Sequence, residues 1–160
     1  MTARKFELTN ETRVSSAGAP KILYRIRALR SFGDVKAGDL GGFVENARNL
    51  QHKGECWIYD NGEVCDKAVV RDNAKVIDKA VVYGSATIAE SARVRNNAKV
   101  NGNARISGLA VVGDKARVQG KAQIGEFANL SGDAWVFSSA VVTGSATVEN
   151  NAQVRGEAQV

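Results

Sequence analysis

The chain has 160 residues, of which 44% are hydrophobic, and a formal net charge of +5. With one proline and 16 glycines, this composition excludes a disordered chain and fits one or two compact domains. No apolar run approaches the roughly 20 residues that span a membrane, and the polar start MTARKFELTNE lacks the apolar core of a signal peptide. We therefore expect a cytoplasmic protein with no membrane partner.

Residues 1–41 are predicted to form a small cap built on a β-hairpin. Its strand-like runs are residues 5–9 and 22–29, and in the second run apolar side chains alternate with Arg25 and Arg27. A hairpin with a single apolar face is not stable alone. We therefore expect it to cover the open end of the repeats that follow, as repeat proteins need for solubility.

The positive charge is concentrated near this cap. Residues 1–55 hold ten Lys and Arg against six Asp and Glu, whereas the rest of the chain holds twelve against eleven. Four of these cations form a predicted basic patch: Arg25, Arg27, Arg30 and Lys36. Such a patch could contact nucleic acid or an acidic protein. No aromatic interleaving, recognition helix or zinc pattern accompanies it, so a solvated face is the simpler interpretation.

From Cys56 to Val160 the sequence repeats every six residues without a slip, as in AVVRDN, AKVIDK and AVVYGS. The third position is Val, Ile or Leu in all eighteen repeats, and the first is Ala in sixteen. On an α-helix residues six apart would point in different directions, whereas on a strand the first and third positions share a face. The pattern therefore predicts short strands that turn Ala and Val toward one interior.

The fifth position of the repeat is predicted to form a corner. It is Gly in seven, Asp in five and Asn in two of the seventeen complete repeats. These residues tolerate the left-handed backbone that a sharp turn needs.

Hexapeptide repeats of this kind resemble the left-handed parallel β-helix superfamily, whose triangular coils each use three repeats. The resemblance covers residues 56–160 and implies an all-β fold of about six coils, with residues eighteen apart stacked on one another. Phe43–Val44 and Arg48–Leu50 look like two earlier, less regular repeats. We therefore predict a cap over residues 1–41 and a left-handed β-helix over residues 42–160.

The entry segment YRIRALRSFGDVKAGDLGGFVE, followed by CWIYDN, is similar to uncharacterised hexapeptide-repeat proteins of phages and prophages. This second resemblance spans the whole chain. It implies a phage origin but transfers no activity to any residue.

Two outer surfaces are predicted to contact protein partners. The first has two aromatic rings and two arginines on three successive coils of one side: Trp135, Phe137, Arg117 and Arg155. Aromatic residues rimmed by arginine are typical of interface centres. The second surface lies at one corner, where residues eighteen apart should stack: Leu109 and Phe127, next to Val111. The expected partners are further copies of this chain and a foreign protein.

The superfamily resemblance also implies acyltransferases, which act as trimers, use coenzyme A thioesters and place a histidine between subunits. The single histidine, His52, lies in QHKGE outside the regular repeats and is interpreted as a loop residue. Cys56 and Cys65 are the two cysteines, and neither a disulfide nor a zinc site is predicted from them. No cofactor or metal is therefore expected.

The sequence is compatible with three functions. The prediction is a non-enzymatic, phage-encoded binding protein that self-associates and engages a host macromolecule, such as a CRISPR or other antiviral effector. The alternatives are a coenzyme A-dependent hexapeptide acyltransferase and a structural, self-assembling module. The missing catalytic histidine favours the first over the acyltransferase.

Overall fold

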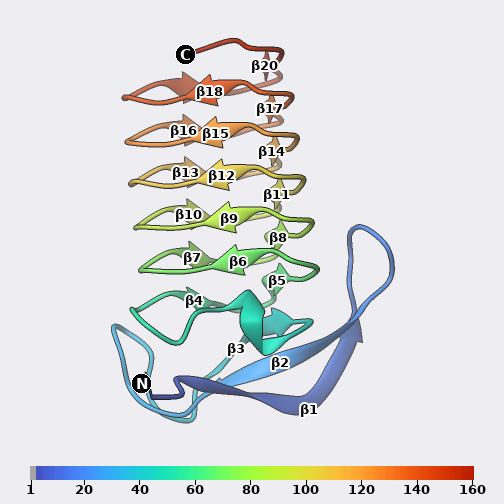
Figure 1. The fold of residues 1–160 in the computed structure, drawn as a ribbon, viewed down its shortest axis with the longest axis vertical. Coiled ribbons are helices and arrows are strands. Elements are labelled where there is room, and N and C mark those ends of the chain that lie inside the picture. Colours follow the sequence, from blue (N-terminus) through green and yellow to red (C-terminus); the bar gives the residue numbers. More distant parts are fainter. Residues whose placement is uncertain (1–2) are drawn as a thin grey trace.

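The structure is a computed structural model that describes residues 3–160. The chain winds upward from an N-terminal hairpin through about six stacked coils, in a left-handed sense (Figure 1). It begins with three longer strands and one 3-10 turn: β1 (Phe6–Val14), β2 (Ile22–Ala28), β3 (Leu40–Val44) and η1 (Ala47–Asn49). The predicted fold class, an all-β parallel β-helix with an antiparallel hairpin at its start, is confirmed.

Two-residue strands build the three sides of the prism. One side joins the hairpin sheet and contains β5 (Glu63–Val64), β8 (Val81–Val82), β11 (Lys99–Val100), β14 (Arg117–Val118), β17 (Trp135–Val136) and β20 (Gln153–Val154). The second contains β4 (Trp57–Ile58), β7 (Lys75–Val76), β10 (Arg93–Val94), β13 (Val111–Val112), β16 (Asn129–Leu130) and β19 (Thr147–Val148). The third contains β6 (Val69–Val70), β9 (Thr87–Ile88), β12 (Arg105–Ile106), β15 (Gln123–Ile124) and β18 (Val141–Val142).

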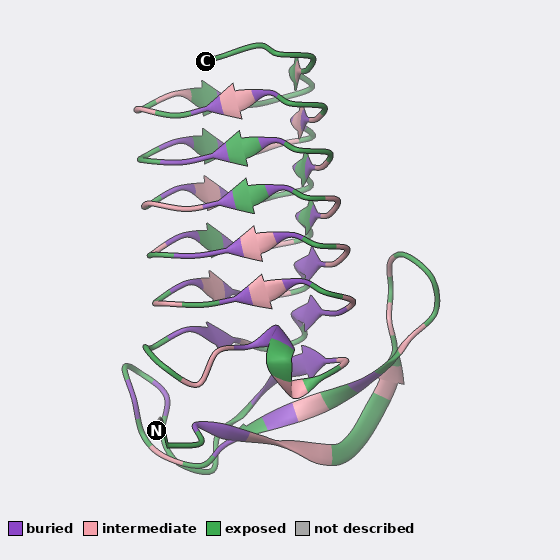
Figure 2. Cartoon of the chain, viewed as in Figure 1, coloured by how far each residue is buried: buried purple, intermediate pink, exposed green. Residues whose placement is uncertain are grey.

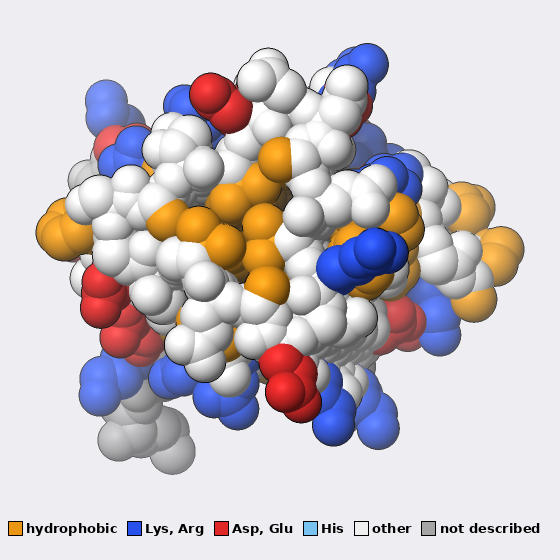
Figure 3. Space-filling model, turned by 90° about the horizontal axis from the view of Figure 1, so that it is seen from above, with side chains coloured by type: hydrophobic (Ala, Val, Ile, Leu, Met, Phe, Trp, Pro, Cys, Tyr) orange, Lys and Arg blue, Asp and Glu red, His pale blue; other side chains and the backbone are white. Residues whose placement is uncertain are grey.

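The interior is a stack of Ala and β-branched side chains, as the repeat predicts. Neighbouring strands pair in parallel with residues eighteen apart in register, for example Val94 with Val112. The second residue of each strand from β4 to β19 is buried, which gives every coil a buried inner surface (Figure 2). Viewed along the axis, hydrophobic side chains fill the centre and charged ones lie at the periphery (Figure 3). Area burial of this kind is the main source of stability.

The predicted corners are also confirmed. All seventeen fifth-position residues have a positive φ, including non-glycine residues such as Asp78 (61°) and Asp114 (53°). The backbone N–H groups at some corners are satisfied by the corner side chain one coil earlier. Asp78 Oδ2 accepts from the Asn96 N–H at 3.1 Å, and Asp114 Oδ2 accepts from the Gly132 N–H at 2.8 Å. Corner Asp residues therefore adopt the left-handed backbone of the turn and also accept a hydrogen bond from the next coil.

The hairpin is continuous with one side of the prism. β1 pairs antiparallel with β2, β2 antiparallel with β3, and β3 runs parallel to β5. The first strand is longer than the expected residues 5–9, because its Thr12–Val14 end pairs with the start of β2. Since β3 belongs both to the hairpin sheet and to the first coil, the division at residue 41 stays a prediction.

A lysine closes the lower end of the prism. The Lys5 ammonium is fully buried (0% exposed) and donates to the Gly54 carbonyl at 3.4 Å, the Cys56 carbonyl at 2.6 Å and Cys56 Sγ at 3.2 Å. The first coil has no strand beneath it to bond these carbonyls, so the ammonium takes that place. Burial lowers the pKa of Lys5 and raises that of the Cys56 thiol.

The hairpin covers outward positions that the repeat alone predicts to be exposed. Trp57 is 1% exposed, packed edge-on against Phe6 and Phe32. Glu63 is 3% exposed and accepts hydrogen bonds from Arg13 at 2.7 Å and from the Ser16 N–H at 2.8 Å. The first coil therefore has buried inner and outer surfaces, which anchors the cap on two sides of the prism.

Candidate functional site

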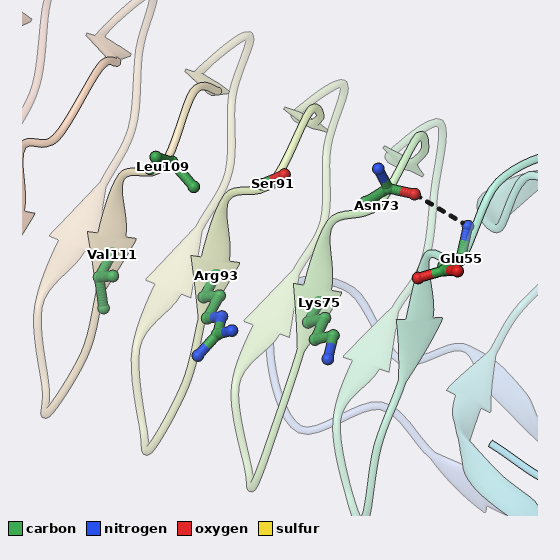
Figure 4. Close-up of a pocket in the computed structure, with 7 residues that line it drawn as sticks. All are labelled: Glu55, Asn73, Lys75, Ser91, Arg93, Leu109 and Val111. Carbon is green, nitrogen blue, oxygen red and sulfur yellow. Dashed lines mark hydrogen bonds between the residues drawn. The ribbon is translucent and has the colours of Figure 1, made fainter. Parts of the chain in front are cut away.

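A groove of about 500 Å³ runs along one edge of the β4–β7–β10–β13 side. Its residues come from two columns, one at a corner and one on the strands, each repeating every eighteen residues (Figure 4). The corner column is Glu55, Asn73, Ser91 and Leu109, and the strand column is Lys75, Arg93 and Val111. The groove is therefore polar and charged at its lower end and apolar at its upper end.

Glu55 lies at the lower end because the loop of residues 51–55 turns sharply against the coil above. Gly54 has φ +79° and a Cβ there would overlap the Asp72 carbonyl, so the turn requires glycine. The Glu55 N–H donates to Asn73 Oδ1 at 3.1 Å, which fixes the corner residue of the next coil (Figure 4). This arrangement leaves the Glu55 side chain exposed at the mouth of the groove.

A second carboxylate reaches the same side from the loop between β2 and β3. Tyr59 OH donates to Asp34 Oδ1 at 2.7 Å, and Lys75 Nζ lies 4.0 Å from the same oxygen. The hydrogen bond from Tyr59, followed by the charge of Lys75, holds the pKa of Asp34 below its ordinary value. Burial and the bond to Asp34 raise the pKa of Tyr59, so at neutral pH the phenol is protonated and Asp34 is ionised.

His52 is oriented away from proton-transfer chemistry. Its Nδ1 accepts from the Lys5 N–H at 3.0 Å, and its ring stacks on Phe6 with centroids 4.5 Å apart. Burial and the neighbouring Lys5, Arg4 and Arg30 charges lower the pKa of His52, so the neutral ring is favoured. With Nδ1 accepting, the proton of the neutral ring sits on Nε2, which then has no free lone pair to act as a base.

The first predicted surface is assembled on the β17 side. The Trp135 and Phe137 rings pack against each other with centroids 4.3 Å apart and planes tilted by 32°, and the Arg117 guanidinium lies 4.5 Å from the Trp135 ring centroid. Arg155 follows β20, one coil further along the axis. Whether this surface meets a protein stays a prediction.

The second predicted surface overlaps the groove. Leu109 and Val111 line its apolar end, while Leu109 and Phe127, 53% and 64% exposed, project one above the other at the corner. Sequence reasoning thus found the apolar end of the groove and missed its charged end. The available signal was the cations Lys75 and Arg93, which fall eighteen residues apart on one side.

The predicted basic patch is not a single cluster of free cations. Arg25 pairs with Glu11 at 2.7 Å, Arg27 pairs with Glu7, and Arg30 donates to the His52 carbonyl at 3.2 Å. Lys36 lies apart, on the loop before β3. Two of the four cations therefore have acidic partners within the hairpin.

Residues 3–160 include no group of three or more His, Cys, Asp or Glu residues that could hold a metal ion. None of the helical segments described is long and apolar enough to cross a membrane. Cys56 and Cys65 are both free and buried, and burial raises the pKa of Cys65 to about 12.

Comparison with known proteins corrects the functional prediction. No family model matches the chain. A stretch of 66 residues is 38% identical to an Escherichia coli (strain K12) protein named "Uncharacterized acetyltransferase YdcK", which amounts to 38% of this chain and 20% of that protein. The chain thus matches about a fifth of its relative. The similarity contradicts the expectation that the protein is not an enzyme and supports the acyltransferase alternative.

Proposed function

We propose that the protein transfers an acyl group from a coenzyme A thioester to an amine or hydroxyl acceptor in the groove between Glu55 and Val111. The observation that carries the proposal is the similarity of a 66-residue stretch to a protein named as an acetyltransferase. The groove supports it because it combines cations, a carboxylate and an apolar end on one rigid side.

Lys75 and Arg93 would hold the phosphate groups of the donor. They stand in register on consecutive coils, about 4.8 Å apart along the axis. Lys75 has one long ion-pair contact, to Asp34 at 4.0 Å, and lies 5.5 Å from the Tyr59 ring centroid, whereas Arg93 has no ion-pair partner within residues 3–160. Cations that are not already neutralised are the ones able to bind phosphate.

Glu55 would accept the proton that the acceptor loses. The acceptor N–H or O–H gives its proton to the Glu55 carboxylate as the nitrogen or oxygen attacks the thioester carbonyl. The C–S bond then breaks, and Glu55 gives that proton to the leaving thiolate. The Ser91 hydroxyl lies between Glu55 and the apolar end, where it could donate to the carbonyl oxygen, and Leu109 and Val111 would contact the acyl chain.

This assignment departs from the family in one respect. The acyltransferases that the repeats resemble use a histidine, and the hydrogen bond from Lys5 occupies the nitrogen of His52 that would otherwise accept a proton. A carboxylate base therefore replaces the imidazole in our proposal.

Titration calorimetry with acetyl coenzyme A tests the donor site. We expect saturable binding that weakens at least tenfold in Lys75→Ala, Arg93→Ala, and is unchanged in Arg71→Ala, Arg105→Ala, a matched pair on the third side. Glu55→Gln should keep donor binding but lose transfer to a panel of amino sugars, amino acids and polyamines. Absence of saturable binding at millimolar concentration would overturn the proposal.

Self-association, a protein partner and a phage origin stay predictions. Exposed Leu109 and Phe127 beside the groove support the first, since a second copy seated on them would narrow the groove's apolar end.

A further inference from the structure

One side of the prism, which carries β8, β11, β14, β17 and β20, has positive but no negative side chains at the outward positions of these strands. Each of these strands presents two outward positions, and none of the ten is acidic. Three of them are cations: Lys99, Arg117 and Arg155. All three are exposed, so this side offers a row of positive charge along the axis.

These cations are free, unlike those of the hairpin. Arg25 and Arg27 pair with Glu11 and Glu7, whereas no ion pair within residues 3–160 involves Lys99, Arg117 or Arg155. Strands along this side are spaced by about 4.8 Å, so β8 to β20 span about 19 Å. An extended polyanion lying along the axis would meet the three cations in turn.

Aromatic rings lie in the same row. Trp135 packs against Phe137 with the two rings tilted by 32°, and the Arg117 guanidinium lies over the Trp135 ring. Trp135 Nε1 is buried without a hydrogen-bond partner, so the ring is held by packing and by the Arg117 guanidinium. Neutral amides flank the rings: Gln119 one coil below and Gln153 one coil above. Both rings are half-buried, which leaves part of the aromatic surface open.

We propose that this side binds single-stranded nucleic acid. Cations that track a backbone, combined with rings on which bases stack, are the two features of single-strand recognition, and amides can bond base edges. A duplex would keep its bases from the rings, and its curved surface would meet few cations of a straight, flat side. An acidic protein would use the cations but has no need of an aromatic pair. The inference is independent of acyl transfer, because it uses another side of the prism.

Fluorescence anisotropy with labelled 20-nucleotide dT and dA strands and a 20-base-pair duplex tests this proposal. We expect the single strands to bind at least tenfold more tightly than the duplex. Binding should also quench tryptophan emission, because Trp57 is buried and Trp135 is the partly exposed tryptophan. That quenching should be lost in Trp135→Phe.

Two sets of variants separate charge from stacking. Removing Lys99, Arg117 and Arg155 together should weaken binding and lower the slope of log affinity against log salt by about 2, since each phosphate contact contributes about 0.7. Phe137→Ala should weaken binding with the slope unchanged. Arg71→Ala, Arg105→Ala on the third side is the control, and each variant must keep the native circular dichroism.

Several outcomes would overturn the proposal. They are equal affinity for duplex and single strand, or a control pair as damaging as the triple variant. If dextran sulfate competes as well as dT and Phe137→Ala leaves the affinity unchanged, the side binds polyanions in general, and the proposal fails. The variants on this side of the prism should not change the binding of acetyl coenzyme A, which depends on Lys75 and Arg93. Failure of one proposal therefore leaves the other standing.

Discussion

Single residues at the corners decide whether the chain can close its coils. Each corner needs a left-handed backbone, which costs an L-residue with a Cβ roughly 1–2 kcal/mol unless a short polar side chain compensates locally. Asp114, with φ of 53°, makes one bond to each neighbouring coil: its N–H donates to Asn96 Oδ1 at 3.0 Å, and its Oδ2 accepts from the Gly132 N–H at 2.8 Å. Corner carboxylates thus link successive coils along an edge.

Substitutions at Asp114 should rank by these two properties. Asp114→Asn keeps an acceptor and tolerates the backbone, so it should be nearly neutral. Asp114→Gly loses only the acceptor, which costs about 1 kcal/mol. Asp114→Ala loses the acceptor and adds the left-handed penalty, for a total of about 2–3 kcal/mol. Thermal unfolding followed by circular dichroism measures the order, and an alanine variant as stable as the glycine variant would contradict it.

At the scale of elements, the hairpin is joined to the prism by strand pairing through β3, by packing against Trp57 and by a few polar contacts. The start of β1 is held to the first coil by the Lys5 N–H bond to His52 and by the buried Lys5 ammonium. The other end of the hairpin is held by Arg13 and Ser16 on the buried Glu63 carboxylate. The first attachment adjoins the loop of residues 51–55 that carries Glu55, so this part of the cap and the lower end of the groove depend on the same loop.

The attachment at His52 should make stability depend on pH. The pKa of His52 is lowered in the folded protein, so the unfolded chain binds the proton more readily. This contribution is therefore fully present above the ordinary histidine pKa of about 6.5 and is lost as pH falls through the lowered folded value. We expect the melting temperature to fall by a few degrees between pH 7.5 and pH 5.

His52→Asn is the matched control, since its amide oxygen can accept from the Lys5 N–H without titrating. The variant should show a shallower decline over the same pH range. If the wild type and His52→Asn decline in parallel, other groups cause the pH dependence.

The sequence predicts the structure well where it repeats and poorly where it does not. The hexads predict interior, corners and register correctly, because each position meets the same surroundings in every coil. They fail at Trp57 and Glu63, which occupy outward positions but are covered by the hairpin, a non-repeating segment. Glu55, at the charged end of the groove, was missed for a related reason, because it comes from the irregular loop, whose path no repeat specifies. Lys75 and Arg93 follow the repeat, but the repeat does not show that Glu55 lies beside them.

At the scale of the whole molecule, stability is a sum over neighbouring coils, since each coil contacts only the coils above and below. A defect in a central coil therefore separates the protein into two shorter stacks. A defect on an outer surface leaves the stack intact.

Val100 and Lys99 are adjacent residues that test this distinction. Val100 is 0% exposed, so Val100→Asp would bury an unpaired carboxylate at a cost of several kcal/mol and should unfold or aggregate the protein. Lys99→Asp lies on the exposed face of the same strand and should leave the far-ultraviolet circular dichroism native. Similar behaviour of the two variants would show that the assignment of inner and outer faces is wrong.

The chain returns to the same side every eighteen residues, as from Arg93 to Val111, so the length of the groove is fixed by the number of coils. Inserting one whole coil between β10 and β13 would lengthen the groove by about 4.8 Å while every later side chain kept its direction. Inserting a single residue into a strand would instead turn the later side chains of that strand to the wrong face. Duplication of whole coils is therefore a route by which such a protein could change the length of ligand it accommodates in fixed steps, without redesigning its core.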